Sequence, residues 1–262
     1  MPTLFTFNFI SIAVVALLLW VVKKYIKKEK WQNLLLISAS VGTVLLHYSM
    51  FFYHCFKGTG IWYLSENPNL LIPIYPCNIV MWSAVIFAFL KNKNSKLGQF
   101  LGDYIFWFGL ISALVGMFLN VDFMENPTFL DFEITKSVLA HVTLLFNLLL
   151  IPVFGFIKID MRRNMRHIIY CIILMLIVGV YCNTVLEAIG SRALAYDKNS
   201  MFLLHSPFEG VDFLTYPVIA LIAIPIYFGL FAVCDLFSFK RVEKFYNRFG
   251  SYCKEKFGTK KL

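Results

Sequence analysis

The stretch HIIYCIILMLIVGVYCNTVLEA at residues 167–188 decides the fold class. It contains one acidic residue, Glu187, and no lysine or arginine. A helix of about 20 apolar residues, at about 1.5 Å per residue, crosses the roughly 30 Å hydrocarbon core of a bilayer. The stretch therefore predicts a transmembrane helix.

Further apolar segments of similar length surround this stretch. Hydrophobic residues make up 59% of the 262-residue chain and charged residues only 15%, well below the roughly 25% of soluble domains. The first segment lacks a basic leader and a small-residue cleavage pattern, which favours a retained helix over a removable signal peptide. The sequence predicts an all-α, polytopic membrane domain over residues 1–236 with about seven transmembrane helices, at residues 4–22, 33–56, 73–90, 98–118, 137–157, 167–188 and 213–236.

Basic residues follow the first, third, fifth and seventh segments, and the other connections hold only Lys57, Lys136, Arg192 and Lys198. Cytoplasmic loops carry the excess of lysine and arginine, so we expect the N-terminus outside and the C-terminus in the cytoplasm. The acidic outer loops exclude binding of an anionic polymer such as nucleic acid. The frequent use of Lys, Asn, Ile and Phe is typical of a low-GC bacterial genome. We therefore expect a bacterial plasma membrane.

The C-terminal residues 237–262 alternate aromatic with basic side chains. This pattern predicts a basic amphipathic tail on the anionic inner leaflet, and a merely solvated basic tail is the alternative.

Polar residues that hydrocarbon should reject gather near the outer ends of the segments. Cys77 and His141 lie equally shallow in two segments that both enter from outside. An imidazole can take the proton of a thiol, and the thiolate then attacks an acyl carbonyl, so this pair suggests nucleophilic catalysis. The alternatives are a packed small thiol and a helix-packing hydrogen bond.

Other chemistries remain open at this stage. His47 and His54 are seven residues apart and would share a helix face, as in a metal-dependent membrane hydrolase. Cys55 and Cys77 would both face the oxidising side, where a disulfide would remove the nucleophile. A transporter or sensor would instead depend on Asp103, in the fourth segment and in the inner half of the membrane. No metal, soluble cofactor or protein partner is predicted.

Five short motifs, in this order and spacing, resemble the YwaF-like integral membrane proteins, a family that includes the transmembrane protein 164 type of acyltransferase. They cover most of residues 45–235 and are IPIYPCN at 72–78, FWFGLISALVGMF at 106–118, NPTFLDFEITKSVLAH at 126–141, CNTVLE at 182–187 and MFLLHSP at 201–207.

The resemblance implies a membrane acyltransferase that moves fatty acyl chains between phospholipid and lysophospholipid without coenzyme A. Cys77 would be the nucleophile, His141 the base, and Asn183 would orient His141 or stabilise the oxyanion. Members of this family usually carry a histidine where this chain has Tyr75. The same residues would serve a lipase or a lipoprotein acyltransferase. Expected substrate-side residues are His54, Tyr75, Asn199 and His205.

Overall fold

The computed structural model describes residues 4–118, 132–158, 160–189, 199–206 and 211–236, together with residues 251 and 254. Every regular element in these ranges is helical, which confirms the all-α prediction. The elements, in chain order, are α1 (Leu4–Tyr25), α2 (Glu29–His47), α3 (Ser49–Phe56), α4 (Gly60–Glu66), the 3-10 turn η1 (Pro68–Leu70), α5 (Pro76–Phe89), α6 (Lys96–Phe118), α8 (Phe132–Val153), α9 (Met161–Ile189), the 3-10 turn η3 (Ser200–Phe202) and α10 (Tyr216–Leu236).

Each of the seven predicted segments coincides with helix, but they differ in length. Four helices, α1, α6, α8 and α9, are long and apolar enough to cross a membrane, and α2 with α3 makes a fifth if the bent pair is one span. The shorter apolar helices are α5, of 14 residues, and the first part of α10. The chain is thus a polytopic helical membrane protein, while the count of seven spans and the orientation stay predictions.

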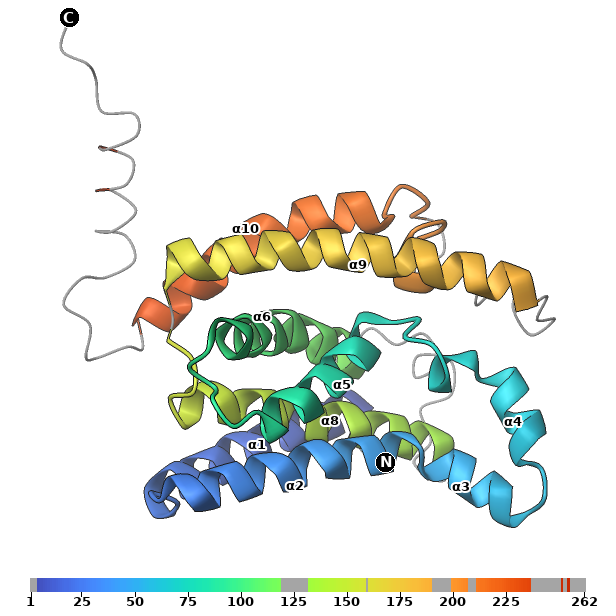
Figure 1. Cartoon of the computed structure of the whole chain (residues 1–262), viewed down its shortest axis with the longest axis horizontal. Coiled ribbons are helices and arrows are strands. Elements are labelled where there is room, and N and C mark those ends of the chain that lie inside the picture. Colours follow the sequence, from blue (N-terminus) through green and yellow to red (C-terminus); the bar gives the residue numbers. More distant parts are fainter. Residues whose placement is uncertain are drawn as a thin grey trace, which may run out of the picture.

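The second predicted segment is interrupted by a bend of 49° between α2 and α3. The bend lies at Tyr48, whose φ and ψ of −87° and 1° leave the helical region. The Tyr48 hydroxyl donates to the carbonyl of Leu70 at 2.6 Å, and its ring contacts Trp82. These contacts hold α3 and α4 to one side of the bundle (Figure 1).

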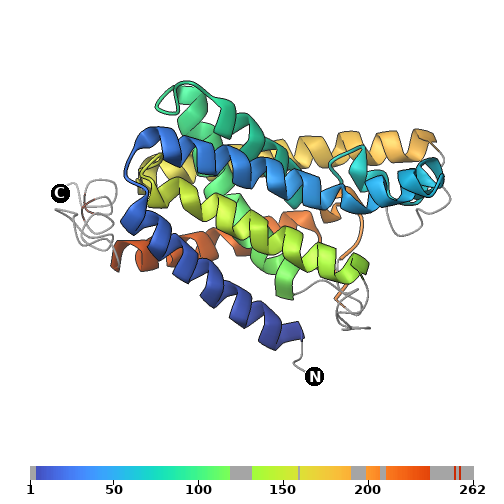
Figure 2. The ribbon, with the colours of Figure 1, turned by 90° about the horizontal axis from the view of Figure 1, so that it is seen from below.

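The helices form two groups around α5 and α6. In Figure 1, α9 and α10 lie on one side of α6, and α1, α2 and α8 lie on the other. Seen from below in Figure 2, α1 diverges from its neighbours towards the N-terminus. The core is centred on α6, where the Trp107 side chain is fully buried against Phe231 of α10.

Small and polar residues allow the central helices to approach closely. A Cβ on Gly109 of α6 would lie 2.9 Å from Val80 of α5 and 3.1 Å from Leu148 of α8. Ser40 of α2 bonds the Asn147 side chain of α8, with 3.0 Å from Asn147 Nδ2 to Ser40 Oγ. Close backbone approach and interhelical hydrogen bonds drive helix association in lipid, where hydrophobic burial gives little.

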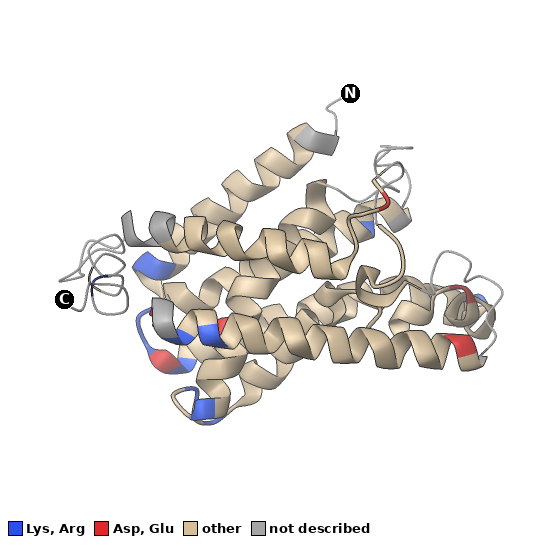
Figure 3. Cartoon of the chain, turned by 90° about the horizontal axis from the view of Figure 1, so that it is seen from above, with Lys and Arg blue, Asp and Glu red and all other residues tan. Residues whose placement is uncertain are grey.

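The described lysines and arginines gather at one end of the helices, with few at the other (Figure 3). This matches the alternation of basic connections predicted from the sequence. Asp122, Glu125 and Asp131, which make one of the predicted outer loops acidic, lie outside the described residues, and so does nearly all of the predicted tail at 237–262.

Candidate functional site

Cys77 occupies the first turn of α5, which begins at Pro76. Proline suits this position because its ring fixes a helical φ and the missing N–H would have no helical partner. Asn78 closes the turn, since its side-chain oxygen accepts from the N–H of Tyr75 at 3.1 Å. The thiol is free and half-buried, at a helix N-terminus whose dipole stabilises negative charge. The helix starts three residues later than predicted, which leaves Cys77 at its N-terminal tip.

A short loop packs over this tip. The Ile74 carbonyl, just before α5, accepts from the N–H of Met201 at 2.9 Å and from Ser200 Oγ at 3.0 Å. Met201 and Phe202 adopt φ values of 56° and 55°. Such left-handed conformations are uncommon for residues other than glycine and persist where the surroundings enforce them. The loop is thus fixed against the start of α5.

Asn183 of α9 anchors the same loop. Its Oδ1 accepts from the N–H of Ser200 at 2.8 Å, and its Nδ2 lies 3.4 Å from the Ser200 carbonyl. Both ends of the amide are therefore engaged by one residue of the loop. The described hydrogen bonds of Asn183 give it a positioning role, on the opposite side of the α5 tip from the predicted contact with His141.

Asn199 serves the loop in the same way. Its Oδ1 accepts from the N–H groups of Leu204 and His205 at 2.9 and 3.0 Å, and its Nδ2 donates to the His205 carbonyl at 2.9 Å. These bonds leave the ring of His205 exposed at the surface. The Tyr75 ring packs against Phe202 with 5.9 Å between ring centroids. Two of the predicted substrate-side residues, Tyr75 and His205, thus flank the loop.

His54 lies apart from this group, on α3. Its ring stacks on Tyr63 of α4 with 4.3 Å between centroids and 9° between planes, and its Nδ1 lies 2.9 Å from Thr59 Oγ1. These contacts join α3 to α4. The structure does not bring His54 together with Cys77 or His141 through any described hydrogen bond.

His141 lies half-buried in α8, with its ring against α6. Its Nδ1 is 2.8 Å from the carbonyl of Ser137, one turn earlier. A carbonyl only accepts, so this bond assigns the hydrogen to Nδ1 and leaves a lone pair on Nε2 in the neutral ring. A Cβ on Gly116 would lie 2.1 Å from Nε2, so the ring fits only because residue 116 is glycine. This tautomer is the one a general base needs.

The helix registers relate Cys77 to His141. Ser40 Oγ lies 3.4 Å from the Ala84 carbonyl of α5 and 3.2 Å from Asn147 Oδ1 of α8. Both helices run antiparallel to α2 and therefore parallel to each other. Counting seven residues back from Ala84 and from Asn147 makes Cys77 level with Ala140. The contacts at Gly109 instead make Cys77 level with Leu145. The two estimates place Cys77 and His141 within about one helical turn, roughly 5 Å, in depth.

Sequence reasoning missed Asn8 and considered His47 only as a possible metal ligand. His47 ends α2 on the same face as Ser40, and its Nε2 is buried without a hydrogen bond. Asn8 is fully buried in α1; its Nδ2 donates to the Met117 carbonyl, and its Oδ1 has no partner. An asparagine in the middle of an apolar first segment was a signal that could have identified Asn8.

The geometry weakens two of the alternative chemistries. The bend at Tyr48 places His47 and His54 on different helices, so they do not share the helix face that a metal site would use. No group of three or more His, Cys, Asp or Glu able to hold a metal is present in the part of the chain that the structure describes. Cys55 is exposed and Cys77 half-buried, and both thiols are free.

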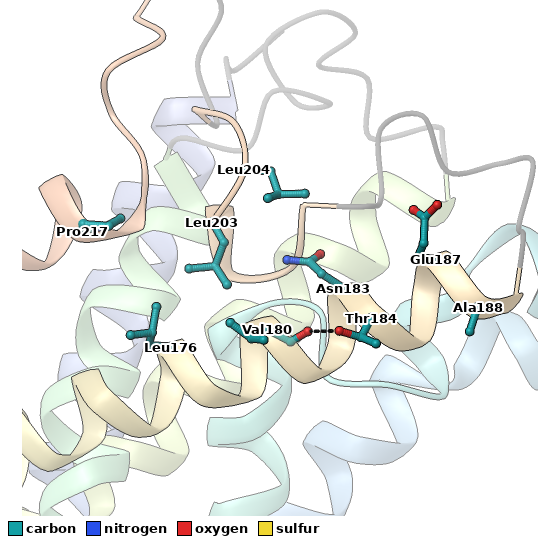
Figure 4. Close-up of a pocket in the computed structure, with 9 residues that line it drawn as sticks. All are labelled: Leu176, Val180, Asn183, Thr184, Glu187, Ala188, Leu203, Leu204 and Pro217. Carbon is teal, nitrogen blue, oxygen red and sulfur yellow. Dashed lines mark hydrogen bonds between the residues drawn. The ribbon is translucent and has the colours of Figure 1, made fainter.

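An open groove of about 750 Å³ runs along the C-terminal half of α9, beside the anchored loop (Figure 4). Its walls are mostly apolar, and its polar residues, Asn183, Thr184 and Glu187, lie towards the end of α9. The span from Leu176 to Ala188 corresponds to about 18 Å of helix. The full lining consists of Leu176, Val180, Asn183, Thr184, Glu187, Ala188, Leu203, Leu204 and Pro217.

A second polar cluster lies near the other end of α6. The buried carboxylate of Asp103 accepts from Arg163 Nε at 3.1 Å and Nη2 at 3.3 Å, and its Oδ2 lies 2.6 Å from His167 Nδ1. Arg163 also donates to the carbonyl of Lys158. Arg163 and His167 are four residues apart on α9, so the cluster clamps α9 onto α6.

A comparison with protein families matches residues 1–235 to the TMEM164 family. No curated protein and no solved structure matches the chain.

Proposed function

The chain belongs to the TMEM164 family, and from this membership and the geometry at the start of α5 we propose that it is a membrane acyltransferase. It moves fatty acyl chains between glycerophospholipids through a thioester on Cys77. The observation that carries the proposal is a free thiol at a helix N-terminus, within about a turn in depth of an imidazole whose Nε2 is the unprotonated nitrogen.

The first half-reaction follows from these two groups. His141 Nε2 takes the proton of the Cys77 thiol, and the thiolate attacks the ester carbonyl of a donor phospholipid. The positive end of the α5 dipole stabilises the resulting oxyanion. The carbon–oxygen ester bond breaks, the leaving alkoxide takes the proton from His141, and lysophospholipid departs. The described conformation contains no hydrogen bond between Cys77 and His141, so this proton transfer requires the two side chains to move into contact.

The groove along α9 supports a lipid as the substrate. Its apolar wall matches an acyl chain in length, and its polar end, at Asn183 and Glu187, is suited to a glycerol or headgroup. The loop at Ser200–Phe202 separates the groove from the α5 tip, and Asn183 holds that loop in place. In this proposal Asn183 and Asn199 shape the substrate path, and Tyr75 and His205 flank its approach, while His54 supports the packing of α3 on α4.

The test is direct detection of the acyl-enzyme. Purified protein in nanodiscs is incubated with isotope-labelled phosphatidylcholine, quenched in acid and measured by intact mass. We expect a hydroxylamine-labile acyl adduct that is absent in Cys77→Ala and forms at least 100-fold more slowly in His141→Gln. Cys55→Ala, which removes an exposed free thiol, is the matched control and should retain the adduct.

Absence of both adduct and lipid exchange in the wild-type protein would overturn the proposal and leave Cys77 as a structural residue. A transporter or sensor would then be tested by substituting Asp103. Labelling of the protein by acyl-CoA without phospholipid would contradict the coenzyme A independence. If an adduct forms, mass spectrometry of the product separates transfer to lysophospholipid from hydrolysis or transfer to a lipoprotein.

A further inference from the structure

His47, whose Nε2 is buried without a hydrogen bond, lies on the face of α2 that contacts α5 and α8. Leu36, Ser40, Thr43 and His47 recur at helical spacing, and the first three are buried. Ser40, in the middle of this face, reaches both α5 and α8. His47 therefore continues the same face outward to the level of Cys77 and His141.

A buried nitrogen without a partner costs roughly 1–3 kcal/mol, and such groups are normally satisfied. His47 Nε2 is one of five such atoms in the described residues, and it is the one that belongs to an imidazole. This combination points to a hydrogen-bonding ligand that is present only during the reaction.

In the second half of the proposed acyl transfer, the incoming acceptor must lose a hydroxyl proton to a base near the thioester. His141 is neutral again once it has returned its proton to the first lysolipid, so the chemistry admits either imidazole, and position and burial distinguish them. His141 has its Nε2 against Gly116 of α6, while His47 stands on α2, which packs against α5 directly. The two imidazoles thus approach the α5 tip from different helices.

We propose that His47 is the base of the second half-reaction and binds the free hydroxyl of a lysophospholipid acceptor. This inference rests on the proposed function. His47 Nε2 takes the hydroxyl proton, and the acceptor oxygen attacks the thioester carbonyl. The carbon–sulfur bond breaks, and the Cys77 thiolate takes the proton back from His47. The thiol, the neutral imidazole and a new phospholipid ester are the products.

The experiment separates the two halves of the reaction. Full-length protein in nanodiscs is loaded with labelled phosphatidylcholine, and lysophosphatidylcholine is then added while the acyl adduct is followed by intact mass. For His47→Gln we expect adduct formation at the wild-type rate and adduct loss slowed about 100-fold. Thr43→Ala is the matched control, since Thr43 lies on the same face and bonds only its own helix, at Ala39, and it should behave as wild type.

The outcomes are distinguishable. Adduct loss at the wild-type rate in His47→Gln overturns this inference and leaves the proposed function intact. Failure of His47→Gln to form the adduct also overturns it, provided that the variant elutes as a folded protein, because His47 would then act in the first half. His47→Asn is a second variant in case the glutamine protein does not fold, and the same accumulation is expected. If the wild-type protein forms no adduct, the proposed function itself fails.

Discussion

The two polar clusters of the molecule differ in whether their side chains have hydrogen-bonding partners. At one end of α6, each charged group of the cluster of Asp103, Arg163 and His167 has a partner within about hydrogen-bonding distance. At the other end, the Cys77 thiol is free, and His47 Nε2 and Asn8 Oδ1 are buried without partners. Both regions lie in helices that a membrane surrounds, where unpaired polar groups are costly.

This difference teaches which region holds helices together and which one is prepared for a ligand. In a saturated cluster, the polar groups form hydrogen bonds with one another, so the cluster stabilises the fold. An unsaturated cluster keeps its capacity for a molecule that arrives later. Substitutions in the two regions should therefore affect stability and activity separately.

The largest expected effect is the loss of stability when the saturated cluster is broken. Asp103→Ala leaves Arg163 partly buried without its carboxylate and should destabilise the fold by about 3–5 kcal/mol. Unfolding in a denaturing detergent series measures this change. Lys158→Ala removes only an exposed side chain, since the Lys158 bond to Arg163 uses the backbone, and serves as the control. A stability of Asp103→Ala within 1 kcal/mol of wild type would contradict the clamp.

At Gly116 we expect the opposite, a large loss of activity with a smaller loss of stability. Gly116→Ala places a methyl group 2.1 Å from His141 Nε2, so the ring must move. A displacement of about 1 Å can lower a reaction rate about 100-fold, while overpacking costs about 1–3 kcal/mol. The acyl adduct should therefore form about 100-fold more slowly in a protein that still folds.

The control for this substitution is Gly42→Ala. Residue 42 also lies in a helix, but a Cβ there meets nothing within 4 Å, so its rate should match wild type. Equal rates for Gly116→Ala and wild type would show that the position of the His141 ring does not govern the reaction.

A smaller effect is expected from the loop anchor. Asn183→Ala removes two hydrogen bonds to Ser200 and should lower local stability by about 1–3 kcal/mol. Hydrogen exchange at the Met201 amide, which donates to Ile74, should rise between 5-fold and 150-fold. Thr184→Ala is the neighbour control, because its hydroxyl bonds the Val180 carbonyl of its own helix. An unchanged rate of hydrogen exchange in Asn183→Ala would show that Asn183 does not hold the loop in place.

The smallest effect concerns Lys93, in the loop between α5 and α6. Its Nζ donates to the carbonyls of Ala88 and Leu90 at 3.2 Å each and caps the end of α5. Burial lowers the pKa of Lys93 below its ordinary 10.5, and Glu29 opposes this shift. The native state therefore releases the proton before the unfolded state does. Stability should rise with pH in the alkaline range between the lowered pKa and 10.5.

Lys93→Met tests whether the stability rises with pH because of Lys93. The stability of wild type relative to Lys93→Met should increase as the pH rises through that alkaline range, as measured by detergent unfolding at several pH values. Lys91→Met, on an exposed neighbouring lysine, should show no such trend. A fall in the relative stability of wild type would mean that the capping bonds outweigh the cost of burying the charge.

The segments that form the bundle were predictable because length and hydropathy determine what crosses a bilayer. The break at Tyr48 was not, since the sequence around it contains neither proline nor glycine, and the bend depends on distant contacts with Leu70 and Trp82. The prediction that His47 and His54 share a face was wrong for that reason. Depth reasoning selected Cys77 and His141, but the anchoring bonds of Asn183 depend on a loop conformation that no local pattern encodes.

The shortness of α5 has a consequence for the surrounding lipid. Its 14 residues extend about 21 Å, against the roughly 30 Å of a hydrocarbon core. A helix shorter than the bilayer is matched by local thinning of the membrane. The bilayer beside α5 should therefore be dimpled, which draws ester groups of nearby phospholipids towards the depth of the thiol. Such hydrophobic mismatch would make the rate of acyl-enzyme formation depend on the thickness of the host membrane.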